Sequence, residues 1–117
     1  MGIFLNPAIS ISEENFIFQS FGIVSWYSEQ DAGINTHTAN GEIFDDSQAT
    51  CASWDFPFGT RLKVRNLANG KTVICRVNDR GPAKRLSRIV DLTKIAFNQI
   101  ADLKAGLIQA SISIASQ

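Results

Sequence analysis

The sequence predicts a mainly β domain, in the form of a small closed barrel of six or seven short strands with one helix. Short segments in which apolar and polar residues alternate recur from residue 21 onwards, and turns rich in Gly, Asn and Pro separate them. Only one segment has the spacing of a helix. The chain has 117 residues, of which 44% are apolar, and this suits one domain with a real core.

The first half of the chain is expected to contribute two strands. Residues 21–28, FGIVSWYS, are aromatic and β-branched, and residues 48–53, QATCAS, form a shorter candidate. Between them, residues 29–42 are too rich in Gly, Asn, Asp and Thr for regular structure. Residues 1–18 are predicted to be a loosely attached N-terminal leader, and residues 19–116 are predicted to form the barrel.

A hairpin is expected in the middle of the chain. Residues 61–67, RLKVRNL, alternate between apolar and basic, and residues 71–77, KTVICRV, form the returning strand. The sequence ANG at residues 68–70 predicts the turn between them. The side chains expected to face the core are Leu62, Val64, Val73, Cys75 and Val77.

The C-terminal part is expected to add two strands and the helix. The strands are residues 87–92, SRIVDL, and residues 107–115, LIQASISIA. The helix is predicted over residues 93–103, with Thr93 as its cap and Gly106 as its stop. Its buried face would consist of Ile95, Ile100 and Leu103.

The charges are unevenly distributed along the chain. There are 11 basic and 11 acidic side chains, and the net charge of zero argues against a non-specific nucleic-acid binder. Residues 1–60 carry eight acidic groups and no Lys or Arg, whereas residues 61–117 carry all 11 basic groups. Strands from both halves are expected to interleave in the fold, because unlike charges then become neighbours.

The start of the chain, MGIFLNPAISISEENFIFQ, lacks the basic region and the long apolar region of a secretory signal. An apolar run of 18 residues is also missing, so no membrane span is expected. These observations leave the cellular compartment open.

The two cysteines, Cys51 and Cys75, lie in separate strand-like segments. A disulfide between them would close a loop of about 24 residues and stabilise the fold by roughly 3 kcal/mol. Two unrelated buried thiols are the alternative. Neither CxxC spacing nor a group of histidines predicts a metal site, since His37 is the only histidine.

Residues 78–82, NDRGP, directly follow an apolar segment. Asn, Asp, Gly and Pro are all typical of turns, so this motif is either a turn or a site. A second Asp-containing segment, RIVDL, follows a few residues later. The motif alone does not decide between the two interpretations.

Taken in order, the motifs GIVSWYS, THTANGE, SWDFPFGT, RVNDRGP and RIVDLT resemble the rare lipoprotein A family. The resemblance covers about residues 21–114, and the ordered set is far more specific than any one motif. It implies a six-stranded double-psi β-barrel with one or two short helices, related to the barwin and expansin barrels. It also favours the interpretation of NDRGP as a site.

The resemblance implies a bacterial cell-envelope protein that acts on peptidoglycan glycan strands. Some members are lytic transglycosylases, which cleave between N-acetylmuramic acid and N-acetylglucosamine. In that reaction the muramyl 6-hydroxyl attacks the anomeric carbon and gives a 1,6-anhydro end. The chemistry needs a well-placed carboxyl as acid and then base. No cofactor is implied, and we expect a monomer.

The resemblance also assigns the site residues. Asp79 of NDRGP would be the acid/base, and Glu42 of TANGE would assist it. Asp91 would contact glycan as in expansin barrels, or else simply lead into the helix. Arg80 would bind sugar groups, or else fasten the turn by pairing with an acidic side chain. The other expected substrate contacts are Asn40, Ser53, Trp54 and Asn78.

Three aromatic residues could stack on sugar rings: Trp26, Tyr27 and Trp54. Because Trp and Tyr in a strand are more often core residues, at least one of Trp26 and Tyr27 is expected in the core. Trp54 lies in a loop segment, so a place in the substrate groove is favoured for it.

One position departs from the family pattern. Active members carry a histidine eleven residues after the TANGE glutamate, and this chain has Ser53 there. A serine cannot titrate near neutral pH. The barrel could therefore be a slower enzyme, could use another group, or could be a non-catalytic, expansin-like glycan-binding module. His37 is expected to be a solvated loop residue and not a replacement.

Overall fold

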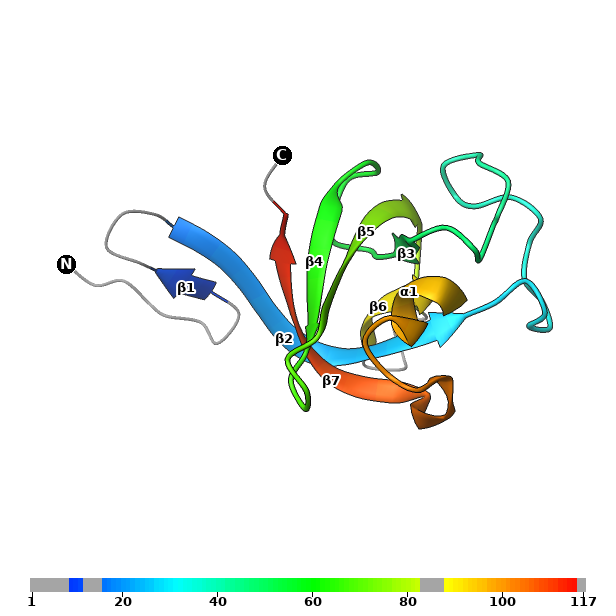
Figure 1. The fold of residues 1–117 in the computed structure, drawn as a ribbon. Coiled ribbons are helices and arrows are strands. Elements are labelled where there is room, and N and C mark those ends of the chain that lie inside the picture. The colour runs from blue at the N-terminus through cyan, green and yellow to red at the C-terminus, as the bar shows by residue number, and fades with distance from the viewer. Residues whose placement is uncertain (1–8, 12–15, 83–87, 116–117) are drawn as a thin grey trace.

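The computed structural model describes residues 9–11, 16–82 and 88–115 of the chain (Figure 1). The helical elements are the short α-helix α1 (Lys94–Asn98) and the 3-10 helix η2 (Leu103–Ala105). The strands are β1 (Ile9–Ile11), β2 (Phe16–Tyr27), β3 (Thr50–Ala52), β4 (Arg61–Asn66), β5 (Thr72–Asp79), β6 (Arg88–Thr93) and β7 (Leu107–Ile114).

Six of the strands close into a barrel in the order β2-β6-β3-β5-β4-β7, and β7 pairs with β2 to complete the ring. The pairs β2–β6 and β3–β5 are parallel, and the other pairs in the ring are antiparallel. The predicted fold, a six-stranded barrel with one or two short helices, is confirmed. Strands from both halves of the chain interleave, as expected.

β1 lies outside the ring and pairs with the first residues of β2. The two strands form an arm that points away from the barrel (Figure 1). The domain boundary expected at residue 18 falls inside β2. The loose attachment of residues 1–18 stays a prediction, and most of that segment lies outside the described residues.

The barrel core forms because β4 and β5 alternate between apolar and polar residues. The five core-facing side chains predicted for this hairpin are all buried. Cys51 and Cys75 form a disulfide between β3 and β5, with their Cα atoms 5.8 Å apart. Of the two alternatives for the cysteines, the structure therefore contains the disulfide, which joins the two halves of the chain inside the core.

The helical segment differs from its prediction. α1 ends at Asn98, and a turn and η2 replace its expected second half. Its buried residues are Ala96 and Phe97, whereas Ile95 is 40% exposed, so the predicted buried face was wrong at Ile95. The hydroxyl of Thr93 does not cap the helix and donates to the Gln48 carbonyl. The helix is short because its end is set by packing on the barrel.

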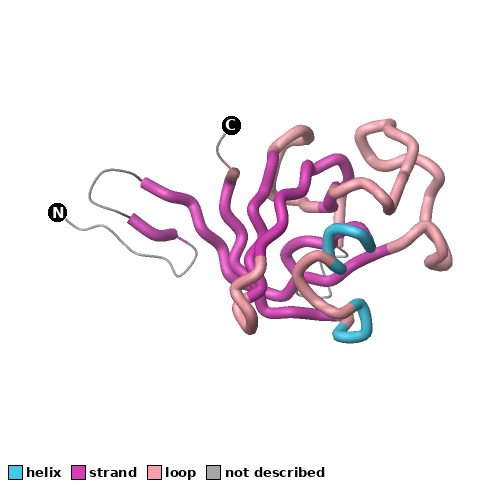
Figure 2. The backbone as a smooth tube through the Cα atoms, in the orientation of Figure 1, coloured by secondary structure: helices cyan, strands magenta, loops and turns pink. Residues whose placement is uncertain are grey.

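The longest loop in the described part of the chain, residues 28–49, joins β2 to β3 at one end of the barrel (Figure 2). It is irregular, as its polar sequence predicts, apart from an isolated bridge between His37 and Ile43. No helix among the described residues is long and apolar enough to cross a membrane.

Candidate functional site

A cavity of about 450 Å³ lies where the 28–49 loop meets the ends of β2, β3, β5 and β6. Two carboxyl groups, those of Asp79 and Asp91, line it together with the His37 side chain. The residues whose roles are described below are Tyr27, His37, Asp79, Arg80, Pro82 and Asp91.

Strand register places the two carboxyl groups on one line across the barrel wall. Ala52 of β3 pairs with Asp79 on one side and with Asp91 on the other. Asp91 in turn pairs with Ser25 of β2. Because strands in a sheet lie about 4.8 Å apart, the Cα atoms of the two aspartates are roughly 10 Å apart.

A β-bulge at the end of β5 helps to aim Asp79 at the cavity. Cys51 pairs with Val77 and the next residue, Ala52, pairs with Asp79, so Asn78 is the extra residue. Bulges of this kind redirect side chains beside active sites. The glycine that follows, Gly81, has a φ of 151°, and a Cβ there would approach the Ala52 side chain.

The carboxylate of Asp79 is held by three donors from different segments. Oδ1 accepts from the backbone N–H groups of Ala39 and Arg80, each at 2.9 Å. Oδ2 accepts from the Tyr27 hydroxyl at 3.2 Å. The 28–49 loop is thereby fastened directly to the carboxylate through Ala39.

Tyr27 lines the cavity beside Asp79. Its ring stacks on Phe44 with centroids 4.8 Å apart, and the side chain is only 9% exposed. Burial, followed by the charge of Asp79, raises the pKa of Tyr27 well above its usual range. The phenol therefore stays protonated and donates to Asp79. Tyr27 is the expected core residue of the Trp26–Tyr27 pair.

Asp91 has a different environment from Asp79. Burial raises its pKa, while the hydrogen bond from the Ser25 hydroxyl and the charge of Arg88 oppose the rise. Burial thus favours the protonated form of Asp91. Asp91 lines the cavity and also lies shortly before the helix, and its contact with glycan stays a prediction.

Glu42 does not line the cavity, and its carboxylate is already paired. Both of its carboxylate oxygens bond the guanidinium of Arg76, at 2.6 and 2.8 Å. Asn40 and Asn78 donate to it as well. The bonds from Arg76, then those from Asn40 and Asn78, lower the pKa of Glu42 to about 2. Glu42 is therefore ionised at any physiological pH and braces the residue that precedes Asp79.

Asn40 and Asn78 have supporting positions. Asn78 is 3% exposed and its amide donates to Glu42, while Asn40 shapes the turn that presents Glu42. That turn closes through the Gly41 N–H to the Thr38 carbonyl, and Gly41 has a φ of 93°, which favours glycine. Neither asparagine lines the cavity where the expected sugar contacts would form.

Arg80 lines the cavity, but its guanidinium is engaged elsewhere. Nη1 donates to the carbonyl oxygens of Ser53 and Phe56, both at 2.9 Å. The group also lies over the Phe58 ring, 3.8 Å from its centroid. Arg80 therefore fastens the turn through carbonyl groups in the 53–59 loop, and not through the acidic side chain that one of the two alternatives expected. Binding of sugar groups, the other alternative, stays a prediction.

The same loop carries Ser53 and Trp54. Ser53 is fully buried, donates its N–H to the Asp79 carbonyl, and does not line the cavity. A direct substrate contact by Ser53 does not fit this position. Trp54 is 48% exposed, and its indole donates to the Pro82 carbonyl at the cavity wall. Trp54 itself does not line the cavity, and its role in a substrate groove stays a prediction.

His37 is exposed, as predicted, and yet lines the cavity that contains both aspartates. Its backbone position is fixed by hydrogen bonds on either side, from Phe44 to Thr36 and from Thr38 to Glu42. The sequence did not reveal this location, because the loop lies 40 residues before the strand end that carries Asp79.

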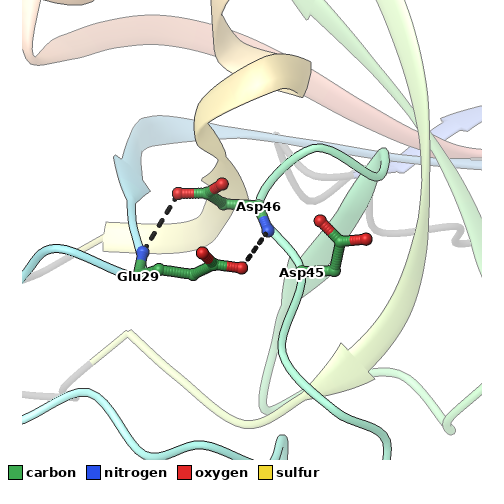
Figure 3. A group of neighbouring side chains, drawn as sticks. All are labelled: Glu29, Asp45 and Asp46. Atoms are coloured by element: carbon green, nitrogen blue, oxygen red, sulfur yellow. Dashed lines mark hydrogen bonds between the residues drawn. The ribbon is translucent and has the colours of Figure 1, made fainter.

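Three acidic side chains gather at the base of the long loop (Figure 3): Glu29, Asp45 and Asp46. Asp46 accepts from the backbone of Glu29, and Glu29 accepts from the backbone of Asp46. Asp45 accepts from Ser47. These carboxylates hold two parts of the loop together, and the group lies outside the main cavity.

Together, the closed six-stranded ring and its two parallel strand pairs define the class of double-psi β-barrels. The model of the family described as lytic transglycolase matches residues 19–112. The chain belongs to this family, and the resemblance to rare lipoprotein A proteins is confirmed.

Curated relatives support this assignment. A probable endolytic peptidoglycan transglycosylase RlpA from Synechocystis sp. is 42% identical over 93 residues, which are 80% of this chain and 28% of the relative. The RlpA protein of Campylobacter jejuni is 44% identical over 85 residues, which are 73% of this chain and 30% of the relative. The chain therefore spans less than a third of the length of these relatives.

Solved structures support the fold. The Streptomyces papain inhibitor aligns with a TM-score of 0.67 at 22% identity, over 84% of this chain and 94% of that chain. An expansin from Clavibacter michiganensis aligns with a TM-score of 0.63 at 24% identity, over 86% of this chain and 52% of that chain. A variant of that expansin in complex with cellohexaose aligns with a TM-score of 0.62 at 22% identity, over 85% of this chain and 51% of that chain.

Proposed function

We propose that this barrel is the catalytic domain of a lytic transglycosylase that cleaves peptidoglycan glycan strands in the cell envelope. The observation that carries the proposal is the single cavity that contains Asp79, Asp91 and His37. Membership of the lytic transglycolase family and the names of the relatives support the same reaction.

In this reaction the bond between the muramyl anomeric carbon and the leaving oxygen breaks, and a bond from the 6-hydroxyl oxygen to that carbon forms. One proton passes to the leaving oxygen and one leaves the 6-hydroxyl, so no water is consumed. Asp79 acts on these groups as the acid/base, held in place by Tyr27 and Ala39. Asp91, whose pKa is raised by burial, is the second group that can hold a proton.

The remaining residues support these two. Glu42 assists as a permanent anion that braces Asn78 beside Asp79. Trp54 offers an exposed ring at the edge of the cavity, where a neighbouring sugar could stack. His37 supplies the imidazole that Ser53 does not, because it lines the cavity from the opposite loop.

The second candidate is a glycan-binding barrel without catalysis. One observation favours it: both oxygens of Asp79 already accept hydrogen bonds from protein donors, an arrangement that suits a fixed acceptor. An expansin of this fold was solved with cellohexaose, a glucan oligosaccharide.

The test is a digest of purified glycan strands, followed by mass spectrometry for 1,6-anhydromuramyl ends. The wild-type chain and Asp79→Asn are compared, with thermal melts to verify that both are folded. Anhydro ends from the wild type alone would support the enzyme. Retention of both proteins on the strands without any cleavage would make this a binding module.

A further inference from the structure

The outer surface of β4 carries three basic side chains in a row, named here the basic stripe: Arg61, Lys63 and Arg65. The alternate residues of the strand are buried in the core, so the stripe faces outward and is exposed. Side chains two residues apart on a strand lie about 7 Å apart on the same face, which makes the stripe roughly 14 Å long.

The strands that carry and flank the stripe contain almost no acidic residues. Residues 56–78 and 103–117 contain no Asp or Glu, so β4 and β7 lack carboxylates and β5 has only Asp79 at its end. The two ion pairs in the described part of the chain, Arg76–Glu42 and Arg88–Asp91, include no residue of the stripe. Uncompensated like charges on one strand repel, and an anionic ligand would relieve that repulsion.

The neighbours of the stripe suit a sugar polymer. Lys63 pairs with Ile74 of β5 and with Ser113 of β7, and Arg65 pairs with Thr72. Hydroxyl groups beside cations can bond sugar hydroxyls while the cations bind anions. The exposed Ile74 side chain, at 41%, adds a small apolar contact next to Lys63.

The stripe is continuous with the site. Arg61 is the cross-strand partner of Arg76, and the guanidinium of Arg76 holds Glu42. Glu42 braces Asn78, the residue before Asp79. A polymer that leaves the cavity past Glu42 would therefore meet Arg61 first and could follow β4 from there.

We propose that the basic stripe binds the carboxylates of a peptidoglycan strand while an adjoining part of the same strand occupies the cavity. The inference rests on the proposed function. Muramyl residues carry a lactyl carboxylate, or a peptide with carboxylates of its own, so negative charges recur along the polymer. Binding at an exposed stripe of this kind is electrostatic and weakens as salt is added.

The experiment is co-sedimentation with purified peptidoglycan sacculi at low and at physiological salt. Lys63→Gln with Arg65→Gln removes two charges from the stripe. Lys94→Gln with Lys104→Gln removes two charges from α1 and η2 and is the matched control. Because exposed ion pairs are individually weak, removing two charges should make the stripe variant bind roughly fivefold more weakly at low salt, and the control should bind as the wild type does.

Three further arms decide the outcome. The difference between the two variants should disappear on sacculi whose carboxylates have been converted to amides, and at high salt. Equal loss in the two variants would overturn the proposal, because net charge alone would then explain it. So would a stripe variant that loses binding to anionic phospholipid vesicles but keeps binding to sacculi.

The proposed function is measured separately, by cleavage of glycan fragments too short to span the cavity and the stripe together. The stripe variant should cleave these fragments at the wild-type rate. If the wild type does not cleave them, the proposed function fails. If it does cleave them while both variants sediment like the wild type, the stripe proposal alone fails.

Discussion

The barrel wall and the rim around the cavity are stabilised in different ways. The wall is a closed ring with alternating apolar side chains and a disulfide inside it. The rim is held by hydrogen bonds and one bidentate ion pair between segments about 34 to 52 residues apart, centred on Asp79 and Glu42. The wall therefore provides most of the stability of the fold, whereas the rim sets the positions and the charges of the carboxylates at the site.

The largest expected effect is on the wall. Replacing the disulfide by Cys51→Ala with Cys75→Ala should cost about 3 kcal/mol and lower the melting temperature by more than about 10 °C. The measurement is a thermal melt of the oxidised wild type and of the variant. A change of only one or two degrees would show that the disulfide does not stabilise the wall.

At His37, a change in the rim should alter activity and not stability. His37→Gln should lower the rate of glycan cleavage by about tenfold or more, because it removes an imidazole that lines the cavity. The melting temperature should stay within about 1 °C of the wild type, since the side chain is exposed. A cleavage rate equal to that of the wild type would contradict the role of His37.

Asp91→Asn should change how the stability of the protein depends on pH. The folded-state pKa of Asp91 is raised, so its carboxyl favours the folded state below its ordinary pKa and this contribution is lost as pH rises. Asparagine does not titrate, so the variant does not lose this stability as pH rises. Its melting temperature should therefore rise relative to that of the wild type between pH 3 and pH 7. Thermal melts of both proteins across this range test the prediction. It would be contradicted if the melting temperature of the variant minus that of the wild type stayed constant or fell as pH rises.

The smallest effect is expected at Glu42. Its folded-state pKa is lowered to about 2, so its contribution is present above its ordinary pKa and is lost as pH falls toward 2. Glu42→Gln should melt roughly 2–5 °C lower at pH 7 and equally with the wild type near pH 2. Asp55→Asn, another exposed acid, serves as the control and should change neither value.

The contrast between wall and rim also explains what the sequence could predict. Alternation located β4 and β5, and the ordered motifs identified the family and placed Asp79 and Asp91 in one site. The partners of those residues were not predictable, since Tyr27, Ala39 and Arg76 meet them only through folding. The helix was predicted too long because its pattern of apolar residues continues past Asn98, where packing on the barrel ends it.

The charge pattern was understood only in part. Strands of the two halves interleave, yet among the described residues one ion pair joins the halves, between Glu42 and Arg76. The described acidic residues of the first half lie in loops, whereas the basic stripe lies on β4. Interleaving of backbone strands does not bring side chains together when they project from different elements.

The pairing of Ala52 with both aspartates has a consequence for changes in chain length. A one-residue insertion in β3 would turn its side chains over and separate Asp79 from Asp91, and the Cys51–Cys75 bond next to this position resists such a slip. The loop at residues 53–59 has no such constraint from strand pairing. The spacing of the two acids is therefore inherited with the strands, so loops around this barrel can lengthen and diversify while the distance between the acids stays the same.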